Sequence, residues 1–457
     1  MSTRNLTELR ILANPVYVPD DPNGRASVEV YRRFFLAGIL SVLTAGCTLG
    51  AVALFGIALR GNYLASSWTP YVLAHANSQL YGWVGFFVMG FALQQHPPRN
   101  SRKALFEKVA WWALGLMAVG VGLRFAAEPL VSVDRSLWLP VGILSCVLQI
   151  AAVALFIANI ALTRYRTGEG LTWQTKFVFA SLAWLAAVAI AEPFYFALSH
   201  QSERMASIAF VAEWFPPYRE AQFLGFVTMM IFGVAFVKMN SCFGAGKASQ
   251  HKGNLGFALW SLGLSMRMIG WIVYFRSGLE GSAGWIYFGG GVALAIAAAV
   301  LVGATRMFEP LDARLHAHKF VRGALAWLLI AGILLILEPF HLAAIGQPFS
   351  HAYTGAVRHA VTVGFISQMI LGVGMHVIGR MNDLTPAQEK PLWTAFVLLN
   401  LGNTLRVILE IGTDYSRSAF LPMGVTGFIE LVALLIWASA VVPPMLSSLR
   451  PRSPHHA

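Results

Sequence analysis

Long apolar stretches alternate with short polar ones along almost the whole chain. Twelve apolar stretches are long enough to cross a bilayer, which takes about 20 residues of helix. The expected spans are residues 34–59, 71–95, 108–127, 137–162, 175–197, 219–238, 254–275, 284–305, 321–342, 358–379, 392–412 and 420–445. The pattern therefore predicts an all-α, polytopic membrane protein with about 12 transmembrane helices.

Two features of the apolar spans repeat with a common spacing. Gly82, Gly225 and Gly364 each follow a histidine or a glutamate by five to seven residues. The distance along the sequence from the first of these glycines to the second nearly equals that from the second to the third, and we call these two distances the repeat steps. Three arginines inside apolar runs repeat with both of these steps unchanged: Arg124, Arg267 and Arg406. Two unrelated features that share both steps indicate tandem duplication of one unit.

The repeat divides a single membrane domain, residues 1–457, into three units of four helices. The expected units are residues 34–166, 174–306 and 319–446, between a polar cytoplasmic leader, residues 1–33, and a tail, residues 447–457. We expect the units to be arranged with pseudo-threefold symmetry, which brings the second helix of each unit close to the centre.

Composition and charge agree with a membrane protein. Hydrophobic residues make up 57% of the chain and charged residues only 12%, which excludes an ordinary soluble globular protein. Loops after the second, fourth, sixth and eighth spans carry several basic residues, such as Arg102 and Lys103, whereas the intervening loops carry one or two, such as Arg276. This positive-inside pattern predicts cytoplasmic termini. The lipid bilayer, and no nucleic acid, is thus the partner that the net charge of +12 implies.

Ionisable residues inside the spans cluster toward the predicted outer face. A charge in the bilayer centre costs roughly 2.5–3.5 kcal/mol, so such residues pair, face the bundle interior or line a site. Glu128 and Glu410 follow Arg124 and Arg406 by four residues, a spacing that lets each pair neutralise itself on one helix face. With Glu220 they predict a buried polar site below the outer surface; the alternative is that these charges only neutralise one another.

Histidines at this depth are candidate metal ligands, because neutral imidazole binds metals and haem iron. His75 and His359 begin the second and tenth spans, so a threefold arrangement makes them neighbours able to ligate one haem. Tyr81, Trp83 and the repeated arginines would then hold the propionates and edges of the haem. His341 and His351 are candidates for a further metal site with His359. The alternative roles are core hydrogen bonding for the first pair and solvated loops for the second.

The local sequence resembles that of a known family. The segments that carry the resemblance are HANSQLYGWVGFFVMGF from residue 75, RHAVTVGFISQMILGVGMHVIGR from residue 358 and LRVIL at 405–409. They are similar to motifs of NnrS-like membrane proteins, and three units of four helices resemble subunit I of haem-copper oxidases and nitric oxide reductases. The resemblance implies a bacterial inner-membrane protein of nitric oxide metabolism or nitrosative-stress protection.

The resemblance also implies the chemistry and the partners. It implies a b-type haem and, as a second candidate cofactor, copper, with nitric oxide or another diatomic molecule as ligand and an electron donor or a membrane complex as partner. By the same resemblance, His75 and His359 are the ligands of the haem.

The chain departs from the oxidases at several metal ligands. Glu220 occupies the position of a copper-ligating histidine, and the tenth span has His359 alone in place of a His-x-His pair, so we do not expect oxygen reduction. Asn77, not His75, is the repeat counterpart of Glu220 and His359. Two other functions therefore stay open, a secondary transporter with a polar site near the outer face and a non-catalytic oxidase-like subunit or assembly factor. Whether the protein is an enzyme also stays open.

Overall fold

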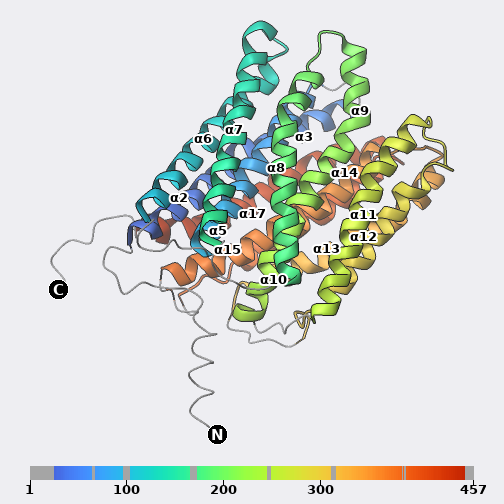
Figure 1. The fold of residues 1–457 in the computed structure, drawn as a ribbon. Helices are drawn as coiled ribbons and strands as arrows, with labels where there is room; N and C mark the ends of the chain where they lie inside the picture. The colour runs from blue at the N-terminus through green and yellow to red at the C-terminus, as the bar shows by residue number, and fades with distance from the viewer. Residues whose placement is uncertain are drawn as a thin grey trace, which may run out of the picture.

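The computed structural model describes residues 25–63, 67–95, 103–164, 172–243, 249–309, 315–382, 384 and 388–447, and every regular element in these ranges is helical. The helices of these ranges join into twelve continuous rods, and Figure 1 shows their arrangement. In chain order they are α2 (Arg25–Ser41) with η2 (Val42–Gly46) and α3 (Cys47–Arg60); α4 (Thr69–Asn77) with η3 (Ser78–Gly85) and α5 (Phe86–Gln95); α6 (Lys103–Leu130); α7 (Arg135–Arg164); α8 (Trp173–Ser199); α9 (Arg204–Glu220) with η5 (Ala221–Thr228) and α10 (Met229–Phe243); α11 (Gln250–Arg276); α12 (Trp285–Gly303); α13 (His318–Ile345); α14 (His351–His359) with η6 (Ala360–Ser367) and α15 (Gln368–Met381); α16 (Trp393–Gly412); and η7 (Arg417–Ala419) with α17 (Phe420–Ser447).

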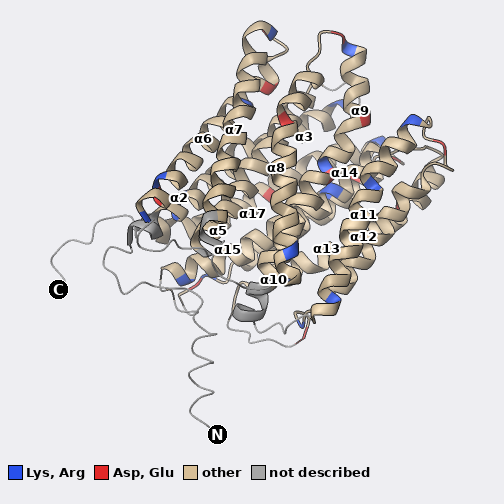
Figure 2. Cartoon of the chain, viewed as in Figure 1, with Lys and Arg blue, Asp and Glu red and all other residues tan. Residues whose placement is uncertain are grey.

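Eleven of these rods are long and apolar enough to span a membrane, so the prediction of an all-α polytopic membrane protein is confirmed. The rod α4–η3–α5, which corresponds to the second expected span, is not among them. Its first half carries His75, Asn77, Ser78 and Gln79, whose polar side chains lower its mean hydropathy. Figure 2 shows that charged residues gather mainly toward the ends of the rods, with a smaller group beside α14.

Three rods lie inside the bundle, and we call them the inner rods: α4–η3–α5, α9–η5–α10 and α14–η6–α15. The most apolar windows of the second and third are 78% and 83% buried, against 33–50% for the other spans. In η3 every residue except Gln79 is buried. These rods are therefore surrounded by protein, whereas the others expose a large part of their surface to the surroundings, here lipid.

The outer helices close a ring around the inner rods. Neighbours in the chain pack together, as α6 with α7, α11 with α12 and α16 with α17. Between the expected units, α7 packs on α8 and α12 on α13, and the last helix, α17, packs on α3 of the first rod. The chain thus returns to its own beginning, and the same kind of contact recurs at each of three junctions.

Each inner rod contains an eight-residue π-helical segment: η3, η5 and η6. They begin at Ser78, Ala221 and Ala360, which are separated by the two steps of the sequence repeat. A π-helix is rare, is strained relative to an α-helix and occurs frequently at functional sites. Its recurrence marks these three segments as structurally equivalent.

Several helix boundaries differ from those expected. The sixth and tenth rods begin at Arg204 and His351, not at 219 and 358, because their first turns are too polar to be recognised as membrane spans. Pro193 and Pro339 lie inside α8 and α13 and do not end them. The first helix begins at Arg25, so residues 25–33 of the expected leader are helical; residues 1–24, Arg102 and the tail from 448 lie outside the described residues.

Tyrosine hydroxyls of the inner rods contact backbone carbonyls of α8 and α13 about one turn before these prolines. A proline leaves the carbonyl four residues before it without its helical partner, and each tyrosine contacts the adjacent carbonyl, five residues before the proline. The hydroxyl of Tyr218 lies 2.9 Å from the carbonyl oxygen of Val188, five residues before Pro193. That of Tyr353 donates to the carbonyl of Leu334, five residues before Pro339, at 2.8 Å. The inner rods thereby anchor α8 and α13.

Candidate functional site

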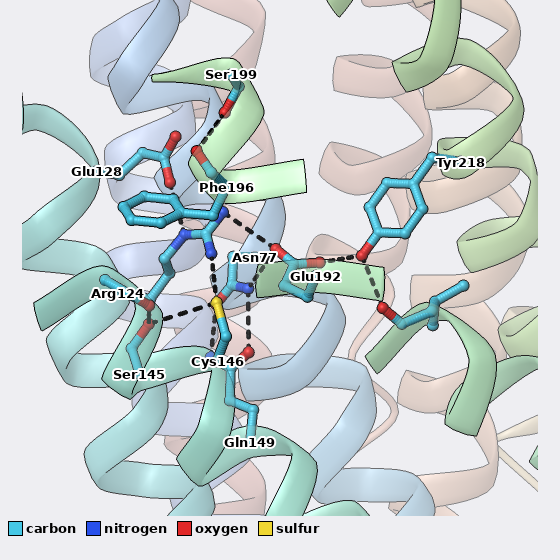
Figure 3. Close-up of polar contacts among 12 residues, drawn as sticks. Asn77, Arg124, Glu128, Ser145, Cys146, Gln149, Glu192, Phe196, Ser199 and Tyr218 are labelled. Atoms are coloured by element: carbon cyan, nitrogen blue, oxygen red, sulfur yellow. Dashed lines mark hydrogen bonds and ion pairs between the residues drawn. The ribbon is translucent and has the colours of Figure 1, made fainter. Parts of the chain in front are cut away.

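The first buried ion network surrounds Arg124 on α6 (Figure 3). Its guanidinium contacts Glu128 on the same helix at 2.6 Å and Glu192 on α8 at 3.1 Å. Glu192 also accepts hydrogen bonds from Asn77 of α4, at 3.3 Å, and from Tyr218 of α9. The i,i+4 pair expected between Arg124 and Glu128 is present, and the sequence did not predict that Glu192 would join it.

The second network surrounds Arg267 on α11. Its guanidinium contacts Glu220 of α9 at 2.7 Å and Glu338 of α13 at 3.0 Å, and lies 4.0 Å from the ring centroid of Tyr287. Tyr287 accepts from Arg267 and donates to Glu338 at 3.2 Å. As in the first network, one arginine is matched with two carboxylates, one of them from the first helix of the next expected unit.

The third arginine, Arg406 on α16, has a different environment. One of its terminal nitrogens donates to Glu410 at 2.9 Å, the second expected i,i+4 pair. Its Nε and Nη1 are buried and have no hydrogen-bond partner among the described residues. Two carboxylate oxygens are likewise buried without a hydrogen-bond partner among the described residues: Oε2 of Glu410 and Oε1 of Glu430 on α17. No second carboxylate forms an ion pair with Arg406 in the described part of the chain.

The third junction between the outer helices is the one where α17 packs on α3. His75 lies at this junction, where α4 meets η2 and α3. Its Nδ1 lies 2.8 Å from the carbonyl oxygen of Gly46, the last residue of the η2 π-helical turn. A Cβ on Gly50 would lie 2.5 Å from the ring, so only a glycine leaves this space for the imidazole. With Nδ1 donating its proton to the carbonyl, Nε2 carries the lone pair, which is the state of a metal-ligating histidine.

His359 on α14 is held in a comparable way. Its Nδ1 lies 3.0 Å from the carbonyl oxygen of Gly355 and 3.5 Å from Glu410 Oε2. Its side chain keeps 29% of its surface accessible although the residue lies deep among the helices. His75 and His359 belong to two different inner rods, and Nε2 of each has no partner among the described residues.

The depth of these residues is greater than expected. His75 and His359 are the seventh and ninth residues of their rods and Glu220 the seventeenth of its rod, whereas the expectation placed each at a helix start. At 1.5 Å per residue they lie roughly 10–25 Å along their helices. The site is therefore inside the bundle, not at its rim.

The other two histidine candidates lie elsewhere. His341 on α13 contacts Asp414 through Nε2 at 2.7 Å and Tyr415 through Nδ1 at 3.3 Å, so both ring nitrogens are engaged. His351 is exposed at the start of α14, its ring 4.8 Å from that of Phe349. Among the described residues, no group of three histidine, cysteine or acidic side chains is placed to hold a metal ion. A copper site stays a prediction.

Tyr81 and Trp83 are fully buried in η3. The hydroxyl of Tyr81 and the indole nitrogen of Trp83 have no hydrogen-bond partner in the described part of the structure. Trp83 packs edge-on against Phe87, with ring centroids 4.5 Å apart, and against Trp437 at 6.1 Å. Buried donors without acceptors are unusual and indicate either internal water or a ligand.

Two arginines that were not among the predicted site residues lie in the same region. They are Arg219, near the end of α9, and Arg358, near the end of α14. Neither forms an ion pair within 4 Å with a described carboxylate. They occupy equivalent repeat positions, separated by the second of the two repeat steps, immediately before Glu220 and His359. That equivalence was the one signal in the sequence that could have identified them.

The donor set at the third junction is suited to haem iron. Two imidazoles on different inner rods each have a fixed Nδ1 and a free Nε2, buried cations lie beside them, and orphaned donors lie on the neighbouring η3. A haem held by two histidines needs two such nitrogens, whereas a protein copper site needs three or four ligands. The residues therefore fit a bis-histidine haem better than a separate copper centre.

Comparison with known proteins assigns the chain to a family. A family model described as NnrS protein matches residues 29–450, nearly the whole of the 457 residues. A comparison with curated proteins gave no match. The match includes all three inner rods, His75, His359 and the three repeated arginines. This chain belongs to the NnrS family.

Proposed function

We propose that this protein binds haem in the membrane and acts in nitric oxide metabolism or in protection from nitrosative stress. NnrS family membership fits a membrane protein related to nitric oxide. The observation that carries the proposal is the pair of histidines on two inner rods, each with Nδ1 at a glycine carbonyl and Nε2 without a described partner.

His75 and His359 would hold the iron of a b-type haem. The carbonyls of Gly46 and Gly355 would orient the two rings and increase the basicity of Nε2, as second-shell partners of metal ligands do. When bound, the haem would supply an iron centre that exchanges electrons with a donor protein, and binding of a diatomic ligand such as nitric oxide would require one of the two histidines to leave the iron. The residues themselves hold the rings, exclude lipid and counter the charge of the group.

The same proposal includes the arrangement in the membrane. The three π-helical segments at the repeat spacing and the closed ring of outer helices support three four-helix units with pseudo-threefold symmetry, related in architecture to subunit I of haem-copper oxidases. The basic loops on one side support cytoplasmic termini and the bacterial inner membrane as location. A parallel threefold repeat also differs from the inverted or paired repeats of many secondary transporters.

The visible spectrum of the purified full-length protein tests the haem directly. Expressed with haem supplied, the protein should show a Soret band that shifts when nitric oxide is added to the reduced form. His75→Ala and His359→Ala should each abolish or shift the band, while His251→Ala, which changes an exposed histidine of α11, should leave it unchanged. A colourless wild-type protein of native fold, or bands indifferent to both substitutions, would contradict the proposal.

The same preparation separates the two other functions. Gradient-driven uptake by haem-free protein in proteoliposomes would support a transporter. A colourless protein that co-purifies with another membrane complex would support a non-catalytic subunit or assembly factor. Metal analysis of the coloured protein tests copper, whose presence at one equivalent per chain would require ligands beyond the two histidines.

A further inference from the structure

We propose that the polar face of α16 holds a chain of internal water molecules, which carries protons from the surface at Asp414 to the buried carboxyl group of Glu430 on α17. The inference rests in part on the proposed haem function, because an electron that enters a buried site favours the uptake of a proton close to it. It goes beyond that function, because it assigns a role to buried polar atoms that the two histidines do not use.

The first argument is the spacing of polar residues along α16. They recur every three or four residues and therefore share one side of the helix: Asn400, Asn403, Arg406, Glu410 and, just past its last turn, Asp414. At 1.5 Å per residue this polar face is about 21 Å long. At one end the side chain of Asp414 keeps 17% of its surface accessible, whereas Asn403, Arg406 and Glu410 are buried. The face thus leads from the surface into the bundle.

The second argument is the element that this face contacts. It packs on the inner rod α14–η6–α15, which carries His359. Glycines of this rod make room for the polar side chains. A Cβ on Gly355 would overlap the carboxylate of Glu410. A Cβ on Gly364 would lie 2.8 Å from Nδ2 of Asn403. The polar face is therefore directed at the inner rod and away from lipid.

The third argument is the group of buried polar atoms without a hydrogen-bond partner among the described residues. Both amide atoms of Asn403 belong to it, although this side chain is fully buried. So do Nε and Nη1 of Arg406, Oε2 of Glu410 and Oε1 of Glu430. A Cβ on Gly402, one turn before Arg406, would lie 2.9 Å from Cγ of Glu430, so α17 meets the polar face here. The group contains both donors and acceptors, which water satisfies together and a single ion does not.

The fourth argument is a comparison within the molecule. In the repeat, Asn403 corresponds to Leu264 on α11 and to Val121 on α6, and both are buried. Packing at this position therefore does not require an amide. A buried amide without partners lowers the stability of the protein, whereas internal water supplies the missing hydrogen bonds. Water explains Asn403 better than packing does.

The fifth argument is the position of Glu430 at the end of this face. The charged or titratable groups that face it are Arg406 and Glu410 from α16 and Cys47 from α3. Space for water is present nearby at His359, whose side chain keeps 29% of its surface accessible and lies 3.5 Å from Glu410. When the site gains one electron from an external reductant, the carboxylate of Glu430 takes one proton from bulk water through the chain and becomes a carboxylic acid.

The first arm of the test detects the water in full-length, haem-free protein in lipid. With ¹⁵N-labelled asparagine, solid-state nuclear magnetic resonance follows the transfer of magnetisation from water to side-chain amides. The signal of Asn403, identified by its loss in Asn403→Leu, should rise several-fold faster than that of Asn159. Asn159 is the matched control, because it is buried on α7 and its amide donates to the carbonyl of Phe106 at 3.1 Å. Equal rise times would overturn the proposal.

The second arm measures the proton in haem-loaded protein by spectroelectrochemistry. The midpoint potential of the wild type should fall as the pH rises, and the slope should shrink at least about twofold in Glu430→Gln, because the group that takes up the proton is lost. Glu430→Asp should keep most of the slope. Glu280→Gln, which changes an exposed acid between α11 and α12, is the control and should behave like the wild type.

The path itself is tested by the rate of this response. After a rapid change of pH, the Soret spectrum of protein poised at its midpoint should relax at least about tenfold more slowly in Asn403→Leu, because one lost hydrogen bond raises the barrier by enough for that factor. The slope at equilibrium should be that of the wild type. Asn159→Leu should relax at the wild-type rate.

The outcomes separate this inference from the proposed function. A wild-type potential without pH dependence, or a slope that survives in Glu430→Gln, would contradict proton uptake at Glu430, and the proposed function still stands if His75→Ala and His359→Ala lose the Soret band. If the protein binds no haem, the proposed function fails and the first arm alone decides. A faster rise at Asn403 then supports the water chain, and equal rise times overturn it.

Discussion

The junctions around Arg124 and Arg406 show how one repeated motif produces two different environments. At the first, Glu192 from the next expected unit reaches Arg124, and Asn77 and Tyr218 complete the network. At the third, η2 presents Gly46 and α3 presents Gly50, neither presents a carboxylate, and the ring of His75 occupies the space.

Because the ring of helices must close, the first helix of the chain takes the role that α8 and α13 have at the other junctions, but without their Glu-Pro sequence. Arg124 forms ion pairs with two carboxylates, whereas Arg406 has two N–H donors without a partner among the described residues. The comparison teaches that similar ion networks stabilise two junctions, and that the third, which lacks one carboxylate, keeps polar groups available for the proposed ligand.

The largest effect on stability is expected at the junction around Arg124. Arg124→Gln would leave Glu128 and Glu192 buried without a cation, which costs about 3–5 kcal/mol when a buried pair is broken. The apparent melting temperature of the purified protein should fall strongly or the protein should not accumulate. Arg135→Gln, at the exposed start of α7, is the control and should behave like the wild type. An Arg124→Gln protein as stable as the control would contradict the structural role of this network.

The junction around Arg406 should tolerate the replacement of its arginine by glutamine better. Arg406→Gln removes the partner of Glu410 but also removes two donors that have no acceptor, so we expect a loss of about 1–2 kcal/mol. Thermal unfolding of the haem-free protein should rank Arg406→Gln between the wild type and Arg124→Gln. A loss equal to that of Arg124→Gln would show that the third junction is as tightly paired as the first.

A glycine exchange probes the space for His75. In Gly50→Ala the new methyl group would lie 2.5 Å from Cε1 of His75 and 2.6 Å from Nδ1, so the ring or the helix must move, at a cost of about 1–2 kcal/mol. The Soret band should shift or weaken as well. Gly115→Ala on α6 is the matched control, because no atom lies within 4 Å of its added Cβ. Equal spectra for both variants would mean that the position of His75 does not matter for haem.

The smallest effect is expected for an exposed carboxylate just beyond the first network. Asp134 caps α7 by accepting hydrogen bonds from Ser136 and from the backbone N–H of Leu137, and these lower its pKa below the ordinary value of 3.8. A lowered folded pKa gives stabilisation that is complete above about pH 4 and is lost as the pH falls through the folded pKa.

Asp134→Ala should therefore lower the apparent melting temperature slightly at neutral pH and not at all well below pH 3. Asp134→Asn, which keeps an acceptor without the charge, should show a smaller and less pH-dependent difference. A difference for Asp134→Ala that grows on acidification would contradict the capping role.

Much of the fold followed from the sequence because it depends on local pattern. Apolar length predicted the rods, and the two steps shared by the glycines and the arginines predicted the equivalence later seen in the π-helical segments. The pairs Arg124–Glu128 and Arg406–Glu410 followed from helix geometry, since residues four apart share a face.

The rest depended on contacts between distant segments. That Glu192 reaches Arg124, or that Gly50 leaves room for His75, is decided by how α8 and α3 pack, which no local pattern contains. The unpartnered state of Arg358 is likewise a property of its neighbours. The polar first turns of α9 and α14 concealed the depth of Glu220 and His359, because apolar length was the criterion for a span.

Electron paramagnetic resonance of the oxidised protein tests the central claim most directly, because two axial imidazoles give low-spin ferric haem. The wild type should show a low-spin signal, and His75→Ala and His359→Ala should each convert it to a high-spin signal or lose haem, while His251→Ala keeps it. A high-spin wild-type signal, or a low-spin signal that survives either substitution, would contradict ligation by His75 and His359.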